Sequence, residues 1–218
     1  MFRNEHNFKD CSLLIVRMEN MMANEQEDRR IIRSKKLIKS AFIELINEKG
    51  FESLTVRDIT KKADINRGTF YLHYEDKYDL LEQLENEMID EMNRLVKEIN
   101  PKEIADFRMQ DEPLPFIVKI LEYIGSNSLM KFLLGSKGHS SFQMKVKELM
   151  KTNVLLKRRE EKMAIPIDYL MAYISSAHLG VIQHWLDGGQ KEAPKDIAKI
   201  LLEMSLFGPF SSAGFKER

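Results

Sequence analysis

The chain holds little glycine, proline or cysteine, and each shortage excludes a class of protein. It contains 10 glycines, 6 prolines and 1 cysteine in 218 residues. The single Cys11 excludes an internal disulfide framework and is typical of a reducing compartment. Because Leu, Ile, Met, Lys and Glu dominate instead, the composition predicts an all-α protein.

Long hydrophobic runs and an excess of one charge are also missing. The apolar stretches are too short to span a bilayer, and residues 11–16 have mixed-charge flanks without the cleavage site of a signal peptide. Lys+Arg and Asp+Glu are both 34, which excludes a uniformly basic coat for nucleic acid. We therefore expect a cytoplasmic protein, in which any nucleic-acid site depends on a local basic patch.

Residues 1–28 differ from the rest of the chain because they hold no sustained hydrophobic period. One interpretation is a flexible N-terminal arm. The other is a mis-assigned start, with translation beginning at Met18, Met21 or Met22. The sequence does not decide between them.

Helical periodicity begins after this segment. Apolar residues at helical spacing predict a helix over 29–49 that ends at Gly50. Ser53 or Thr55 can cap a second helix that ends by residue 64. Asp64 suits a tight turn, and Asn66 can cap a third helix over 67–72. Asp76 is expected to cap a long fourth helix, and further helices follow, the last one closed by Gly208 and Pro209.

Two short helices joined by a tight turn suggest a helix-turn-helix, and the charge distribution supports this. Residues 29–78 hold twelve Lys/Arg and seven Asp/Glu, a local excess of five positive charges in a neutral chain. Such a patch supplies affinity for DNA phosphates. The predicted third helix also has suitable side chains, since Asn66 and Arg67 can reach base edges and Gly68 allows close approach. Donors to phosphates are expected from Thr69, Tyr71, His73 and Lys77.

The sequence over 50–60 and 63–77, followed by Leu80 and Leu81, closely resembles the N-terminal domain of TetR-family transcriptional regulators. The resemblance covers about residues 33–81. Asp64 stands where the family usually has glycine, and Asp can adopt the same turn. By position, the resemblance implies DNA contacts from Thr55, Arg57, Asn66, Arg67, Gly68, Thr69, Tyr71, His73 and Lys77, with Tyr74 packing at the end of the third helix.

The resemblance implies an all-α fold of about nine helices in a dimeric repressor. The expected division is a segment 1–28, a DNA-binding domain 29–78, and an effector-binding and dimerisation domain 79–218. The expected partners are a palindromic double-stranded operator and an unknown small-molecule effector. Residues 115–117, 121–124 and 180–186 also resemble regulators common in Gram-positive bacteria.

A homodimer is expected through about 167–186 and 195–207, where the small Ser176 and Gly180 lie one turn apart and permit close helix approach. The alternative to an effector is a C-terminal domain that binds a protein partner. We expect no enzyme activity or cofactor, since the sequence holds no nucleophile elbow or metalloprotease pair. We expect no metal site, since His178 and His184 would face opposite sides of a helix. The segment 135–138 lacks the spacing of a phosphate loop and is interpreted as a turn.

Overall fold

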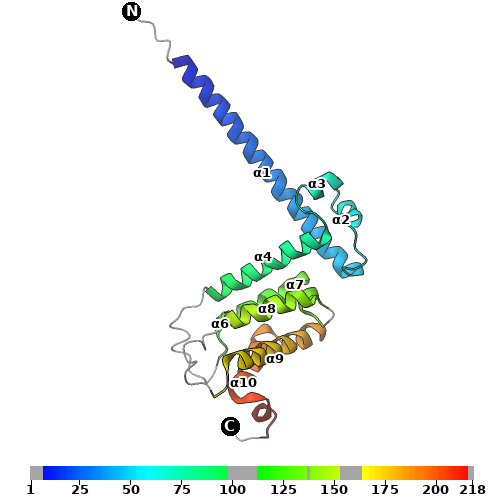
Figure 1. Cartoon of the computed structure of the whole chain (residues 1–218), viewed down its shortest axis with the longest axis vertical. Helices are drawn as coiled ribbons and strands as arrows, with labels where there is room; N and C mark the ends of the chain where they lie inside the picture. The colour runs from blue at the N-terminus through cyan, green and yellow to red at the C-terminus, as the bar shows by residue number, and fades with distance from the viewer. Residues whose placement is uncertain (1–6, 98–111, 137, 153–163, 216–218) are drawn as a thin grey trace, which may run out of the picture. The chain divides into compact units, whose positions relative to one another are not determined.

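The computed structural model describes residues 7–97, 112–136, 138–152 and 164–215 (Figure 1). Over these ranges the chain is entirely α-helical outside its turns and loops, which confirms the predicted fold class. The helices are α1 (Asn7–Lys49), α2 (Val56–Lys62), α3 (Arg67–Tyr71), α4 (Lys77–Lys97), α6 (Pro115–Ser126), α7 (Ser128–Leu134), α8 (Ser140–Thr152), α9 (Ile167–Asp187) and α10 (Pro194–Ser212).

The helices form two compact units, Met1–Leu80 and Leu81–Arg218. The boundary expected from the sequence lies between residues 78 and 79. Helix α4 begins in the first unit and continues into the second. None of the helices in the described ranges has the length and apolar character that crossing a membrane requires.

Helix α1 is longer than the sequence predicts, because it begins at Asn7 rather than near Arg29. The backbone of residues 7–28 is therefore helical, while the expected flexibility of this segment stays a prediction; residues 1–6 lie outside the described ranges. The physical reason is that no glycine or proline precedes Gly50, so a helix nucleated on the core extends backwards at little cost. A translation start at a later methionine stays a prediction.

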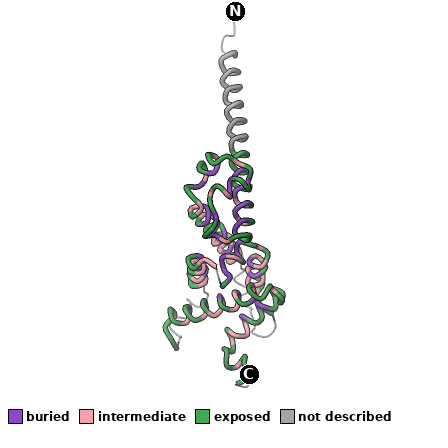
Figure 2. Tube along the Cα trace, turned by 90° about the vertical axis from the view of Figure 1, so that its right-hand side faces the viewer, coloured by how far each residue is buried: buried purple, intermediate pink, exposed green. Residues whose placement is uncertain are grey.

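The core of the first unit lies where α1, α2 and α3 meet (Figure 2). Its fully buried members come from all three helices and the start of α4, and they include Ile38, Phe42, Ile59, Phe70 and Leu80. Phe70 on α3 is fully buried. It holds the inner face of the third helix against α1 and leaves the outer face in solvent.

Local capping fixes the turn between α2 and α3. Thr55 and Asp58 form a reciprocal capping box at the start of α2. Asp64 takes a left-handed φ of 52°, as its position in the turn predicts. The Asn66 side chain accepts a hydrogen bond from the Gly68 amide at the start of α3, and Asp76 Oδ1 accepts bonds from two amides of α4. These predicted caps are confirmed.

The second unit has its own core, built by α4 and α6–α10. Buried apolar residues on facing helices include Leu121, Ile124, Leu133, Phe142 and Trp185. The Trp185 indole N–H donates to the Glu192 carbonyl at 2.9 Å, which fixes the connection between α9 and α10. Residues 153–163, which follow α8 and include the charged stretch 157–162, lie outside the described ranges.

The regular part of helix α10 ends at Gly208, before Pro209, as the sequence predicts. The helix kinks at Gly208, whose φ is 76°, and continues to Ser212. Pro209 then occupies the first turn of the continuing segment, where its missing amide hydrogen is not needed. The kink leaves Phe210 and Phe215 exposed, 6.5 Å apart between ring centroids.

Candidate nucleic-acid interface

The outer face of α3 is open to solvent. Asn66, Arg67 and Gly68 are exposed at its first turn, and Tyr71 is 57% exposed at its last residue. Thr69 is half-buried beside them. The first turn of α3 thus presents polar side chains to solvent, together with a glycine that leaves the backbone open. This is the orientation that a groove-reading helix requires.

No contact among the described residues explains a glycine at position 68. A Cβ built there meets only the Asn66 Oδ1 atom, at 3.7 Å, and the backbone of Gly68 is not left-handed. Glycine inside a helix costs about 0.5–1 kcal/mol relative to alanine. The chain therefore keeps a destabilising residue on an exposed helix face, which fits a partner that approaches the backbone closely.

Two of the expected DNA contacts already use their polar atoms for caps. The Asn66 Oδ1 atom accepts from the Gly68 amide at 2.9 Å. The Thr55 hydroxyl donates to Asp58 Oδ2 at 2.6 Å and accepts from the Asp58 amide at 3.2 Å. A bidentate Asn66–adenine contact would have to share the capped oxygen, so the side-chain amide hydrogens are the groups left for a base.

Arg57 on α2 and Arg67 on α3 are the cations best placed for DNA. Both are exposed, and neither side chain forms a hydrogen bond or ion pair within the described part of the chain. Their guanidinium groups can therefore reach a phosphate or a base edge without breaking an internal contact. Their role in binding remains a prediction.

The predicted phosphate contact His73 has an internal partner. Its Nε2 atom lies 2.6 Å from Oγ of Ser34 on α1. Ser34 Oγ also lies 3.0 Å from the Ile31 carbonyl, so this hydroxyl links His73 to the backbone of α1. Burial and, secondarily, the nearby Lys35 ammonium lower the pKa of His73 below its ordinary value. A neutral imidazole adds no charge for a phosphate.

Lys77 likewise has an internal role. Its ammonium donates to the carbonyls of Phe51 and Glu52 at 3.1 and 3.0 Å. It also lies 4.7 Å from the centre of the Phe51 ring and 5.1 Å from that of Tyr78, within the range of cation–π attraction. Lys77 thus fastens the start of α4 to the loop before α2, and only its remaining N–H can reach a phosphate.

Among the buried polar residues that sequence reasoning missed are Ser34 and Glu85. Ser34 continues the apolar stripe of α1 one turn before Ile38, and Glu85 lies between Leu84 and Met88 on α4. A polar residue within an apolar stripe is the signal that could have revealed them. Each has a specific partner in the structure.

In the second unit, Glu85 joins α4 to α8. Its carboxylate is 3% exposed, and Oε2 accepts from the Lys145 ammonium at 2.9 Å. Oε1 lies 3.2 Å from Nδ1 of His139, just before α8. Lys145 also donates to Asn86 Oδ1 at 3.0 Å. This cluster thus fixes α8 against α4 within the second unit.

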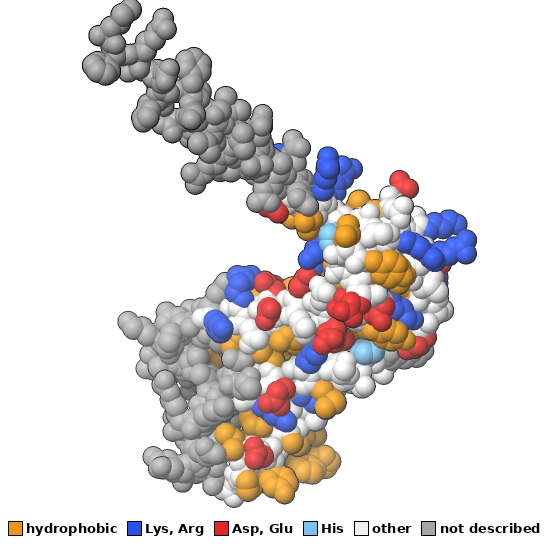
Figure 3. Space-filling model, turned by 45° about the horizontal axis from the view of Figure 1, so that its top comes forward, with side chains coloured by type: hydrophobic (Ala, Val, Ile, Leu, Met, Phe, Trp, Pro, Cys, Tyr) orange, Lys and Arg blue, Asp and Glu red, His pale blue; other side chains and the backbone are white. Residues whose placement is uncertain are grey.

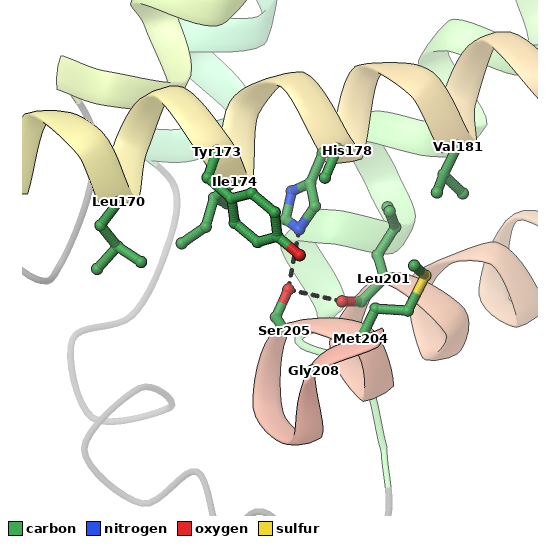
Figure 4. A pocket seen from close by; sticks show the side chains of 10 residues that line it. Leu170, Tyr173, Ile174, His178, Val181, Leu201, Met204, Ser205 and Gly208 are labelled. Atoms are coloured by element: carbon green, nitrogen blue, oxygen red, sulfur yellow. Dashed lines mark hydrogen bonds between the residues drawn. The ribbon is translucent and has the colours of Figure 1, made fainter. Parts of the chain in front are cut away.

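A pocket of about 130 Å³ lies between α9 and α10 (Figure 4). Its only polar pair is His178 and Ser205, in which Nε2 lies 2.9 Å from Oγ and the serine donates to the Leu201 carbonyl at 2.7 Å. Burial lowers the pKa of His178. The remaining lining is mostly apolar and comes from Leu170, Tyr173, Ile174, Ala177, Val181, Met204 and Gly208. Among the described residues, no cluster of three His, Cys, Asp or Glu could hold a metal.

The all-helical architecture and the exposed short helix of a helix-turn-helix define a regulator of transcription. The family model for bacterial regulatory proteins of the tetR family matches residues 38–84, and a model for a transcriptional regulator C-terminal region matches residues 111–206. The chain belongs to the TetR family of transcriptional regulators.

Several known proteins are similar to this chain. The uncharacterized HTH-type transcriptional regulator YxbF of Bacillus subtilis (strain 168) is 23% identical over 181 residues, covering 82% of this chain and 46% of YxbF. The chain thus spans about half the length of that curated relative. A TetR transcriptional regulator from Streptococcus agalactiae 2603V has a TM-score of 0.62 and 29% identity, covering 84% of this chain and 98% of its own.

A more distant likeness concerns the fold alone. The regulator FadR from Bacillus subtilis, solved in complex with stearoyl-CoA, has a TM-score of 0.58 and 18% identity. The match covers 80% of this chain and 98% of that one. The described helices therefore follow an arrangement that recurs at low sequence identity.

Proposed function

We propose that this protein is a cytoplasmic, homodimeric repressor that binds a palindromic operator and is released by a small-molecule effector. The observation that carries the DNA-binding part is Gly68, a glycine that the fold does not need on the exposed face of α3. Arg67 beside it reads a base, and Arg57 contacts a phosphate or base. Thr55, Asn66, Thr69, Tyr71, His73 and Lys77 position the helix or contribute single donors.

The proposed dimer forms through the outer face of α9, together with α10. Residues 169–186 contain no Asp, Glu, Lys or Arg, although Tyr169 and Tyr173 are 74% and 58% exposed. Ser176 and Gly180 are exposed on the same face, and a Cβ at Gly180 meets no atom within 4 Å. An uncharged face with small residues in the middle of the helix suits close packing against a second copy.

Two-fold symmetry would place two copies of α3 in successive major grooves, about 34 Å apart. An effector that prefers a conformation with a different spacing would weaken operator binding by its differential affinity for the two states. Support for a small-molecule effector comes from the fold, since FadR of the same architecture was solved with stearoyl-CoA. This structural similarity does not identify the effector of this chain.

A protein partner is the second candidate for the C-terminal domain. The observation in its favour is the exposed aromatic pair Phe210 and Phe215 after the kink of α10, which leaves apolar surface in solvent. Figure 3 shows hydrophobic side chains exposed at the C-terminal end of the second unit. If α9 and α10 form the dimer without covering Phe210 and Phe215, a partner protein becomes the better explanation for their exposure.

Selection of duplexes by the full-length protein from a random 30-bp library tests the proposal. We expect an enriched palindrome with half-sites about one helical turn apart. Enrichment of no sequence would reject the DNA-binding function. Release of the selected duplex by a small molecule that also raises Tm would support an effector, and release only by another protein would favour the alternative.

A further inference from the structure

Three cations of the helix-turn-helix, Lys49, Lys62 and Lys77, already have internal partners. Lys49 forms an ion pair with Asp58 at 2.8 Å. Lys62 lies within 3.0 Å of two glutamates of α1, and Lys77 binds two backbone carbonyls. The helix-turn-helix therefore offers fewer cations to DNA than its sequence suggests.

The largest run of cations lies instead on α1. Six basic residues fall within eleven positions, and no acidic residue occurs between residues 29 and 43. We call residues 29–39 the basic segment. Lys39 is half-buried, and the other five cations are exposed: Arg29, Arg30, Arg33, Lys35 and Lys36. In Figure 3, Lys and Arg side chains project from the surface of the first unit.

The basic segment lies beside the end of the recognition helix. Ser34, in the middle of the segment, binds His73, two residues after the end of α3, at 2.6 Å. Lys35 is close enough to His73 to contribute to lowering the pKa of that imidazole. The basic side chains within one helical turn of Ser34 on α1 thus extend from the same edge of the domain as α3. Phosphates border the groove that a recognition helix enters, so this edge faces the DNA backbone.

We propose that the basic segment of α1 is a second DNA-contact surface, which binds the phosphate backbone beside the groove entered by α3. This inference rests on the proposed DNA-binding function. Phosphate neutralisation by flanking cations supplies affinity without reading sequence, because it releases counterions from the duplex. The basic segment would thus contribute salt-dependent affinity, while Arg67 and the α3 backbone would contribute sequence preference.

The test compares two sets of four charge-removing substitutions in the full-length protein. Binding to the duplex selected by the native protein is measured by fluorescence anisotropy between 50 and 300 mM KCl, a range chosen to vary binding by about tenfold or more. Glutamine is used because it keeps helix propensity. The test variant carries Arg30→Gln, Arg33→Gln, Lys35→Gln and Lys36→Gln.

A matched control removes the same charge from the second unit, at exposed positions. It carries Lys97→Gln, Lys131→Gln, Lys191→Gln and Lys199→Gln. A third variant exchanges lysine and arginine at the four α1 positions and so keeps their charge. Circular dichroism and sedimentation establish that all three retain native helix content and oligomeric state.

We expect the α1 variant to lose at least about tenfold in affinity at 150 mM salt, and its slope of log affinity against log salt to fall by about 2 or more. The ratio of affinities for the selected and a scrambled duplex should stay within about twofold of native. The charge-keeping exchange should retain the native slope, and the control variant should match the native protein.

Equal slopes for the α1 variant and the control would overturn this inference while leaving the DNA-binding function intact. Failure of the native protein to select any duplex would instead reject the proposed function itself. If the native protein binds phosphatidylglycerol vesicles through these residues and the duplex affinity does not change, the surface belongs to a membrane contact and the inference is wrong.

Discussion

Nε2 of His73 lies 2.6 Å from Oγ of Ser34, and this contact joins the end of the recognition helix to the middle of α1. The imidazole is half-buried and its pKa is lowered, so the folded domain holds it neutral. The orientation of α3 is therefore linked to the protonation of one side chain.

The stability of the DNA-binding unit should fall on acidification. Because the pKa of His73 is lower in the folded state, the unfolded chain binds more protons as pH drops below about 6.5. The stability that the neutral His73 side chain contributes is fully present above that pH. It is lost as the pH falls towards the lowered pKa of the folded state. We expect His73→Gln to show a smaller decrease in Tm between pH 7.5 and 5.5 than the native protein. His178, whose pKa is also lowered, acts in the same direction, so His178→Gln is measured alongside.

Replacing Gly68 with alanine should separate folding from DNA binding. Gly68→Ala adds a methyl group that meets nothing closer than 3.7 Å in the chain, and alanine favours the helix by up to about 1 kcal/mol. We expect Tm to remain native or rise slightly, while affinity for the selected duplex falls at least about tenfold because the methyl group blocks close approach. Native affinity in this variant would contradict the proposed interface.

Arg67 and Lys77 should give different results when substituted. Arg67→Ala removes an exposed guanidinium, so we expect native Tm and a reduced preference for the selected over a scrambled duplex, by about 1–3 kcal/mol. Lys77→Met removes donors to two carbonyls, so we expect about 1–2 kcal/mol lower stability, with a smaller change in salt slope. A native Tm for Lys77→Met would show that its internal bonds contribute nothing.

The Glu85 cluster should stabilise the second unit. Glu85→Ala leaves the Lys145 ammonium without its buried partner, and we expect a loss of about 2 kcal/mol, because Lys145 keeps some access to water. Urea denaturation of Glu85→Ala, Lys145→Ala and the double variant gives the coupling energy. Additive effects would show that the two charges act independently.

Gly180 should control the oligomeric state. Gly180→Gln raises helix propensity, yet its side chain would occupy the exposed face through which the dimer is proposed. We expect a monomer by sedimentation equilibrium at micromolar concentration, with native helix content, while Gly180→Ala keeps the dimer partly formed. A stable dimer of Gly180→Gln would place the interface elsewhere.

Sequence alone determined the helices of the DNA-binding unit and their caps, because these depend on neighbours within a few residues. Thr55 with Asp58, Asn66 with Gly68, and the left-handed Asp64 are local arrangements of this kind. The apolar stripe that predicts α1 includes Ile38 and Phe42, and both are fully buried. The start of α1 was missed, since a helix without breakers needs no periodic stripe to continue.

Tertiary structure decided which polar groups are left to act on DNA. His73 and Lys77 have residue types that suit phosphates, but their partners Ser34 and Phe51 are 39 and 26 positions away in the chain. Local pattern carries no information about such pairs, because they form only when distant helices pack together. The fold thus uses these two side chains to orient the recognition helix, while the exposed arginines remain available for contact.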